Sequence, residues 1–271
     1  MSQARPPVIL TQHDVRDLTY AKTLLEHPGL TARLANIVGV PIEKGFALLP
    51  KDWTMTVQKS VRMALFRALE LAVTTINPRS RRRASDLLHK VMVGASGGIG
   101  GAFGLPALAF ELPISTTIML RSIAEIARTE GHELNDINTK LNCLEVFALG
   151  GRAKGEEAGE SSYWAVRTAL MRAVSEAASY FAQKGVLEKS APAVARLISA
   201  IASRFGVVVS EQVAAKAVPV IGAAGGSLVN VLFMDHFQSM ARGHFIIKRL
   251  EKIYGVAAVR EAYESIALPL K

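Results

Sequence analysis

Hydrophobic residues recur along most of this chain at the three- and four-residue spacing of one helix face. The longest such stripe lies in residues 51–76 and includes Trp53, Val57 and Val61. Charged residues flank this stripe, as expected for an amphipathic helix at a protein surface. No stretch shows the sustained alternation of apolar and polar residues that is typical of a strand. The pattern predicts an all-α fold, a helical bundle with no β-sheet.

Prolines and glycines divide the periodic stretches into separate helices. The predicted helices are residues 14–26, 31–40, 43–49, 51–76, 84–90, 114–128, 138–149, 163–183, 193–204, 217–234 and 235–254. At Glu111 a charge follows an uncharged stretch, and we expect the helix to break there. Pro113 would then lie in the first turn of the next helix, where its missing N–H is not needed.

The length of the chain, 271 residues, is enough for one large helical domain. Two prolines near the start disfavour a helix, so residues 1–12 are predicted to be a flexible tail. N-terminal helices in residues 13–90 are expected to pack on a helical core in residues 91–257. Residues 258–271 are expected to form a C-terminal extension.

Two long stretches, residues 91–110 and 217–234, carry no charged residue and contain glycines spaced four apart. Glycines at that spacing share one helix face and let another backbone approach closely. The packing glycines are Gly94, Gly97, Gly98, Gly100, Gly101 and Gly104 in the first stretch, and Gly222 and Gly226 in the second. Each helical glycine costs about 1 kcal/mol relative to alanine, a cost that close helix contact must offset. We therefore expect a central, hairpin-like pair of helical segments, either buried in the bundle or inserted in a membrane.

The formal net charge of the chain is +9, and half of its residues are hydrophobic. A basic excess suits an anionic membrane surface or nucleic acid, although it can also serve solubility alone. The densest positive cluster is Arg79, Arg81, Arg82 and Arg83. Because it lies just before an uncharged stretch, it is typical of an anchor at anionic lipid on the cytoplasmic side. No helix-turn-helix, zinc or RNA-binding motif accompanies it, which disfavours nucleic acid.

Cys143 is the only cysteine, so an internal disulfide is excluded and a buried structural thiol is expected. The N-terminus lacks the apolar segment of a secretory signal. Both features favour a cytoplasmic protein that is peripheral to, or inserted in, the cytoplasmic membrane.

Ser96 is the weak candidate for a catalytic nucleophile, because residues 94–98 match the G-x-S-x-G pattern of hydrolases. That motif needs a strand before the serine, and no strand is predicted there. Glycines are so frequent in this stretch that a chance match is the stronger interpretation. Ser96 then serves as a small packing residue.

Glu111 and Asp235 each end an uncharged stretch, where a carboxylate must be solvated, paired or functional. Candidate partners are Arg121, Lys216 and Arg242. An ordinary helix-terminal or interfacial charge is the simpler interpretation.

Two histidines lie close to Asp235 on one predicted helix. His236 is expected to be a hydrogen-bonded core residue, and His244 to face water beside Lys248 and Glu251. Helical metal-binding histidines are typically four residues apart, whereas these are eight apart, so no metal site is predicted.

Several segments, in order, resemble the EcsC family. They are ESSYWAVR (160–167), SRFG (203–206), AAKAVPVIGA (214–223), FMDHFQ (233–238), ARGHF (241–245) and RLEKIYG (249–255), with the glycine run, residues 105–106 and 111–113 upstream. The resemblance covers residues 50–257. It implies a role beside membrane transport or secretion, because the founding member is encoded next to an ABC transporter linked to protein secretion. Some relatives carry a peptidase label, and the resemblance supplies no catalytic residues.

The sequence thus predicts a non-enzymatic, membrane-associated accessory protein that needs no cofactor. Its expected partner is an anionic membrane surface, a membrane protein such as a transporter, or both, and self-association into a homo-oligomer is compatible with the pattern. The competing hypothesis is a peptidase-like hydrolase. It requires Ser96, Glu111, Asp235 and His236 to converge in one cleft.

Overall fold

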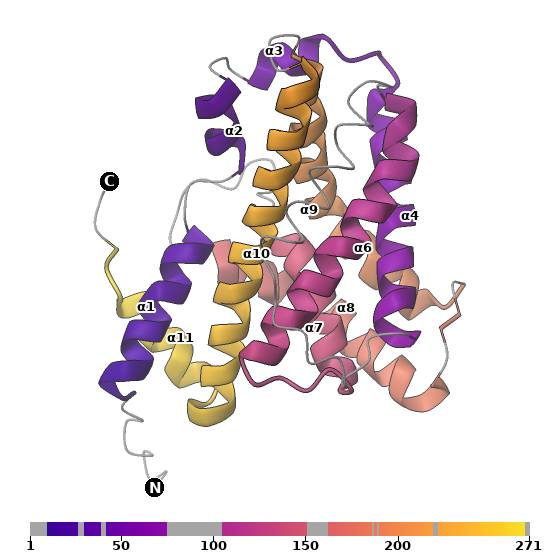
Figure 1. Cartoon of the computed structure of the whole chain (residues 1–271). Helices are drawn as coiled ribbons and strands as arrows, with labels where there is room; N and C mark the ends of the chain where they lie inside the picture. Colours follow the sequence, from indigo (N-terminus) through magenta and orange to yellow (C-terminus); the bar gives the residue numbers. More distant parts are fainter. Residues whose placement is uncertain are drawn as a thin grey trace, which may run out of the picture.

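The computed structural model describes residues 10–26, 30–38, 42–74, 105–150, 162–185, 187–188, 190–218 and 222–268. These residues form ten helices and no strand, which confirms the predicted all-α fold. In chain order the helices are α1 (Gln12–Glu26), α2 (Leu30–Val38), α3 (Ile42–Ala47), α4 (Trp53–Thr74), α6 (Leu105–Thr129), α7 (Ile137–Leu149), α8 (Ser162–Lys184), α9 (Pro192–Ala217), α10 (Gly222–Tyr254) and α11 (Val256–Ser265). They form an elongated bundle, and α10 runs along much of its length (Figure 1).

The predicted helix break at Glu111 is wrong, because α6 continues through Glu111 and Pro113 without interruption. A proline inside a helix removes one backbone hydrogen bond and costs about 3 kcal/mol. Burial of Leu112 and Leu120 on the same helix offsets this cost, and α6 packs along α4 and α10. Tertiary packing has therefore overridden the local breaking signal.

The predicted boundary between residues 217–234 and 235–254 is also wrong. Both segments belong to α10, a single helix of 33 residues. Asp235 does not interrupt the helix, because its carboxylate points to Arg33 on α2 instead of into the core. In the same way α9 extends well past its predicted end at residue 204, and reaches Ala217.

The centre of the bundle is aromatic. Phe147 of α7, Phe205 of α9 and Phe237 of α10 surround one another, with ring centroids 5.0–5.5 Å apart. Phe233 continues the cluster one turn earlier on α10, and all four side chains are fully buried. Tilted and edge-to-face rings at these distances are favourable beyond the apolar area they bury. The cluster holds α7, α9 and α10 together.

Several helix termini meet at one end of the bundle. We call it the α3 end: it consists of α3, the first turns of α4, α6 and α10, and the last turns of α9 (Figure 1). Gly45 of α3 contacts the backbone of Ala214 of α9, which fixes α3 across this end. The described part of the first uncharged stretch begins here at Leu105, and the second stretch begins here at Ala217, the last residue of α9.

The last helix, α11, packs on the bundle and includes the first residues of the predicted C-terminal extension, 258–271. Its Val259 and Tyr263 are fully buried. Lys22 of α1 donates hydrogen bonds to the carbonyl oxygens of Tyr263 and Ile266, at 2.9 and 2.8 Å. These carbonyls close the end of α11 and have no partner within their own helix, so Lys22 serves as its cap.

Close helix contact at glycine does occur, but at glycines other than the predicted ones. A Cβ at Gly150 would lie 2.6 Å from Nε2 of His236, and a Cβ at Gly243 would lie 2.7 Å from Cγ of Leu25. Of the predicted packing glycines, Gly222 starts α10 and Gly226 is buried in its second turn. The close contact expected for these two stays a prediction.

Candidate functional site

Many of the predicted site residues lie outside the described residues. These are Ser96, the packing glycines Gly94, Gly97, Gly98, Gly100, Gly101 and Gly104, and the arginines Arg79, Arg81, Arg82 and Arg83. Their predicted roles stay predictions. Glu111, Asp235 and His236 are described, and their surroundings follow.

Glu111 lies at the junction of α6, α9 and α10. Its Oε1 accepts hydrogen bonds from Nζ of Lys216 at 2.6 Å and from Nδ2 of Asn230 at 2.9 Å. The amide of Gln212 in turn donates to Oδ1 of Asn230 at 2.8 Å. Lys216 was one of the three candidate partners for the two carboxylates. The side chains of Glu111 and Lys216 are largely buried, so this network joins three helices inside the α3 end.

Asp235 and His236 have separate partners on other elements. Asp235 accepts a hydrogen bond from Arg33 of α2 at 2.7 Å, and both side chains are about one-third exposed. His236 is buried, and its Nε2 lies 3.0 Å from the carbonyl oxygen of Gly150, to which it donates. The expectation of a core histidine is therefore met.

These contacts do not support the hydrolase hypothesis. Glu111 contacts α9, Asp235 contacts α2, and His236 contacts the end of α7. A catalytic constellation needs its groups to converge on one reacting atom. The three described members are instead each engaged in a structural contact between helices.

The buried His236 is expected to make the fold sensitive to acid. Burial lowers the pKa of His236 from 6.5 to about 4, against the raising effect of its hydrogen bond to Gly150. Between pH 6.5 and 4, His236 is therefore protonated in the unfolded chain but neutral in the folded chain. The free energy of unfolding should therefore decrease by roughly 3 kcal/mol as the pH falls from 6.5 towards 4.

Urea unfolding of the wild type and of His236→Gln between pH 4 and 7 measures this effect. Glutamine can still donate to Gly150 but does not titrate, so the variant should lose much of the pH dependence. Burial also lowers the pKa of His132 and of His244, so part of the slope should persist. An unchanged slope in His236→Gln would contradict the assignment.

A buried polar cluster joins α7, α8 and α10. Arg167 donates two hydrogen bonds to the carboxylate of Glu251, at 2.5 and 3.1 Å. The hydroxyl of Tyr163 lies 3.0 Å from Nδ1 of His244, and Nε2 of His244 lies 3.9 Å from Oε2 of Glu145. We call these five residues the Arg167 cluster.

The prediction that His244 faces water is wrong, because its side chain is fully buried. The helical repeat correctly places His244 beside Lys248 and Glu251, but α8 covers that face of α10. Sequence reasoning also missed that Tyr163 and Arg167 contact each other in this cluster. The available signal was their position, since Tyr163, Arg167, His244 and Glu251 lie in the segments 160–167, 241–245 and 249–255 that carry the family resemblance.

Within the Arg167 cluster, burial favours one charged pair, which is Arg167 with Glu251. Burial raises the pKa of Glu145 and lowers the pKa of His244, so both are driven towards their neutral forms. Burial is also the largest influence on Arg167, yet its charged neighbours raise its pKa overall. The guanidinium also lies 4.8 Å from the ring centroid of Trp164, a cation–π contact. The cluster therefore locks three helices around one buried cation.

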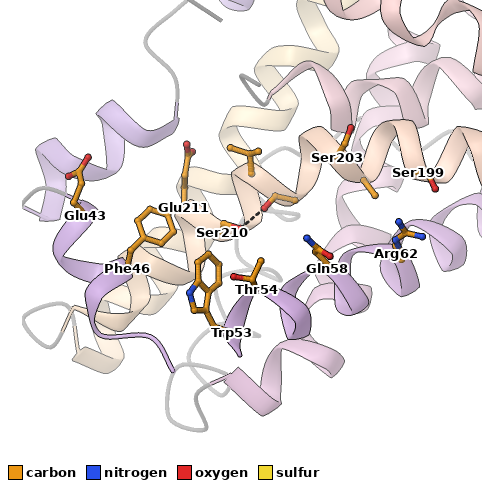
Figure 2. A pocket seen from close by; sticks show the side chains of 13 residues that line it. Glu43, Phe46, Trp53, Thr54, Gln58, Arg62, Ser199, Ser203, Ser210 and Glu211 are labelled. Atoms are coloured by element: carbon orange, nitrogen blue, oxygen red, sulfur yellow. Dashed lines mark hydrogen bonds between the residues drawn. The ribbon is translucent and has the colours of Figure 1, made fainter. Parts of the chain in front are cut away.

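A groove with a volume of about 880 Å³ lies between α3, α4 and α9 (Figure 2). It is lined by Glu43, Phe46, Trp53, Thr54, Gln58, Arg62, Ser199, Ala202, Ser203, Gly206, Val207, Ser210 and Glu211. None of these residues was predicted as a site. They come from the consecutive helices α3 and α4 and from α9, which is more than 100 residues away in sequence, so only the fold brings them together.

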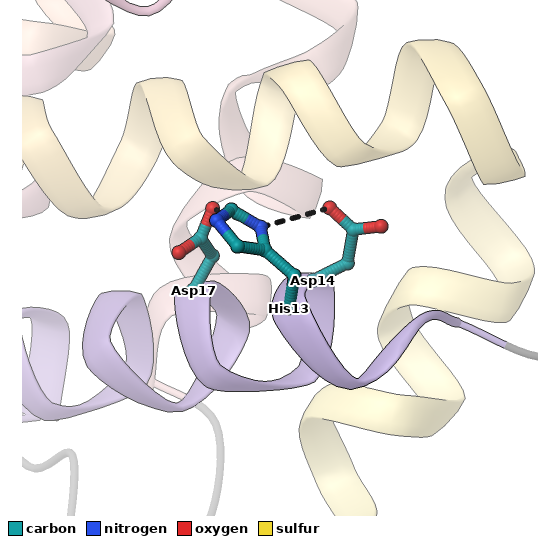
Figure 3. A group of neighbouring side chains, drawn as sticks. All are labelled: His13, Asp14 and Asp17. Carbon is teal, nitrogen blue, oxygen red and sulfur yellow. Dashed lines mark ion pairs between the residues drawn. The ribbon is translucent and has the colours of Figure 1, made fainter.

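His13, Asp14 and Asp17 on α1 form a group whose ligand atoms lie within 4.8 Å of one another (Figure 3). Their charge already has a protein partner, because Arg249 donates to Asp17 at 2.7 Å. Tyr254 also donates to Asp14 at 2.6 Å. The hydrogen bonds from Thr11 and then Tyr254 lower the pKa of Asp14. We interpret the group as the attachment of α1 to α10.

One described helix, α9, is long and apolar enough to cross a membrane by length and composition. In its most apolar window, 39% of the residues are buried within the bundle. A core helix of a soluble protein passes the same test, so this is a weak indication of membrane association.

Comparison with known proteins gives one match. The model of the EcsC protein family matches residues 13–250, which begin at α1 and end four residues before the end of α10. The match extends further towards the N-terminus than the resemblance seen in the sequence. No curated protein and no solved structure matches the chain. The family match covers most of the chain, and the protein therefore belongs to the EcsC family.

Proposed function

We propose that this protein is a non-enzymatic accessory protein that associates with the cytoplasmic face of a membrane through its α3 end. The observation that carries the proposal is the position of exposed apolar side chains. Those nearest the α3 end, just after α3 or within the first three turns of α4, α6 and α10, are Leu48, Met55, Phe110, Ile114 and Leu228. Met55 and Phe110 are 71% and 76% exposed. Large apolar side chains gathered at one place on a surface commonly mark an interaction site.

Two further features support a membrane as the occupant of this surface. Leu105 and Gly222, which start α6 and α10 within the two uncharged stretches, lie at the same end. Lys44, Lys51 and Lys59 are exposed there and outnumber the exposed acids Glu43 and Asp52. Apolar side chains flanked by lysines suit the boundary between acyl chains and anionic headgroups.

Vesicle flotation with the purified full-length chain tests the proposal. Vesicles of phosphatidylcholine with phosphatidylglycerol should bind the protein more tightly than phosphatidylcholine alone. Burying one methionine or phenylalanine contributes about 1.5–3 kcal/mol, so the Met55→Glu/Phe110→Glu variant should bind at least about tenfold more weakly.

A matched control comes from exposed apolar residues at other places on the bundle. Met171 of α8 and Ile253 near the end of α10 are 66% and 61% exposed. The Met171→Glu/Ile253→Glu variant should bind vesicles like the wild type. Equal losses in the two double variants would contradict the proposed orientation. Absence of vesicle binding by the wild type would contradict membrane association itself.

The accessory role implies a protein partner as well as a membrane. A transporter or another membrane protein is the partner that fits the family resemblance. We propose that the membrane positions this protein next to such a partner, and that the partner is held by protein contacts of its own.

A further inference from the structure

We propose that the groove between α3, α4 and α9 binds an extended segment of a partner protein. The segment carries a basic side chain at the α3 end of the groove and an acidic side chain near Arg62. Peptide binding by this groove does not depend on membrane association.

The first argument is the shape of the groove. Thr54, Gln58 and Arg62 are spaced four apart and form a row along the exposed face of α4 (Figure 2). The facing wall, on α9, carries mostly small residues from Ser199 onwards, which leave space between the helices. The lining runs along α9 as far as Glu211, about 18 Å at 1.5 Å per residue. An extended peptide covers that length with about five residues.

The second argument is the hydrogen-bonding capacity of the two walls. Ser203 and Ser210 already donate their hydroxyl protons to the carbonyls of Ala200 and Gly206, at 2.8 and 2.7 Å. Their oxygens can therefore only accept from a ligand. On the opposite wall the side chains of Gln58 and Arg62 bring N–H donors. A peptide backbone supplies both N–H donors and carbonyl acceptors along its length.

The third argument is the chemistry of the two ends. At the α3 end, Phe46 and Trp53 lie with ring centroids 5.5 Å apart, and the exposed Glu43 lines the same end. Aromatic faces beside a carboxylate attract a lysine or arginine side chain. At the other end the exposed guanidinium of Arg62 favours a carboxylate.

The same chemistry disfavours two other classes of ligand. A nucleic acid strand would bring its phosphates against Glu43 and Glu211. An acyl chain would remove water from these carboxylates and from Arg62 without replacing their hydrogen bonds.

The test uses blocked synthetic peptides and the fluorescence of Trp53. The chain has two tryptophans, and the other, Trp164, is buried away from the groove. The probes are Lys-Ala-Ala-Ala-Asp, its reverse order, and Lys-Ala-Ala-Ala-Lys. In the wild type, one of the two mixed-charge peptides should give a saturable signal below about 1 mM and bind about tenfold more tightly than the lysine peptide.

Substitutions in the groove should then change this selectivity without unfolding the protein. Arg62→Glu should invert the order of affinities, so that Lys-Ala-Ala-Ala-Lys binds more tightly than the mixed-charge peptides. Arg67→Glu reverses an exposed charge on α4 outside the groove and should leave the order unchanged. Ser203→Phe, at an exposed position, should fill the groove and weaken all three peptides.

Circular dichroism establishes that each variant is folded before peptides are compared. If no peptide changes the fluorescence of folded wild type below about 1 mM, the proposal is wrong. An unchanged order in folded Arg62→Glu would equally overturn it. Vesicle binding is measured separately, so this result stands apart from the membrane proposal.

Discussion

Arg167→Met is expected to lower the free energy of unfolding by about 3–5 kcal/mol, a large share of the roughly 5–15 kcal/mol that stabilises a typical folded domain. Arg167 donates two hydrogen bonds to Glu251, and the two side chains are only 13% and 7% exposed. Removing the guanidinium leaves the carboxylate of Glu251 buried, with the ammonium of Lys248 3.8 Å away. It also removes the cation from the face of Trp164. Urea unfolding followed by circular dichroism measures the loss.

A double-mutant cycle separates the ion pair from the loss of packing. Arg167→Met/Glu251→Leu replaces both charges by apolar side chains and should be more stable than Arg167→Met alone. Arg172 of α8 provides the control, because its ion pair with Glu176 is at the surface. Arg172→Met should change stability by no more than about 1 kcal/mol. A similar small change in Arg167→Met would show that the Arg167 cluster does not hold the helices together.

Lys216→Met is expected to cost about 3 kcal/mol and to loosen the α3 end specifically. Its ammonium is 2.6 Å from Glu111, and the two side chains are 15% and 10% exposed. Without Lys216, Glu111 keeps the hydrogen bond from Asn230 but has lost the cation that balances its buried charge. Because Glu111, Lys216 and Asn230 lie on three different helices, the contacts between these helices should weaken together.

Hydrogen exchange can locate this effect. Amides in the first turns of α6 and α10 should exchange faster in Lys216→Met, whereas amides of α7 near the Arg167 cluster should not. Glu111→Gln/Lys216→Met removes both charges and should recover part of the stability. Faster exchange spread evenly over all helices would mean that the network has no local role.

The Arg167 cluster also provides a structural explanation for three of the segments that carry the family resemblance. Segments 160–167, 241–245 and 249–255 are separate in sequence, yet they supply Tyr163, Arg167, His244 and Glu251 to one buried site. Buried polar groups are costly unless every member is paired, so such a site restricts which residues can replace its members. A structural role is therefore sufficient to explain these residues.

Some features of this protein could be predicted from local sequence because they depend on neighbouring residues. The all-α class follows from the helical repeat, and the prolines and glycines place the ends of α1–α4, α7 and α8 within a few residues. The EcsC resemblance is also a property of ordered local segments. The partner of Glu111, which is Lys216, could be narrowed to three candidate residues, since a buried carboxylate needs a cation.

Other features were decided only by contacts between residues distant in sequence. The continuity of α6 through Pro113 and of α10 through Asp235 depends on packing that outweighs local breaking signals. The burial of His244 depends on α8, which covers a face that looks polar along α10 alone. The groove depends on three helices whose lining residues span positions 43 to 211. Periodicity shows which side of a helix is apolar, but only the tertiary structure determines what covers each side.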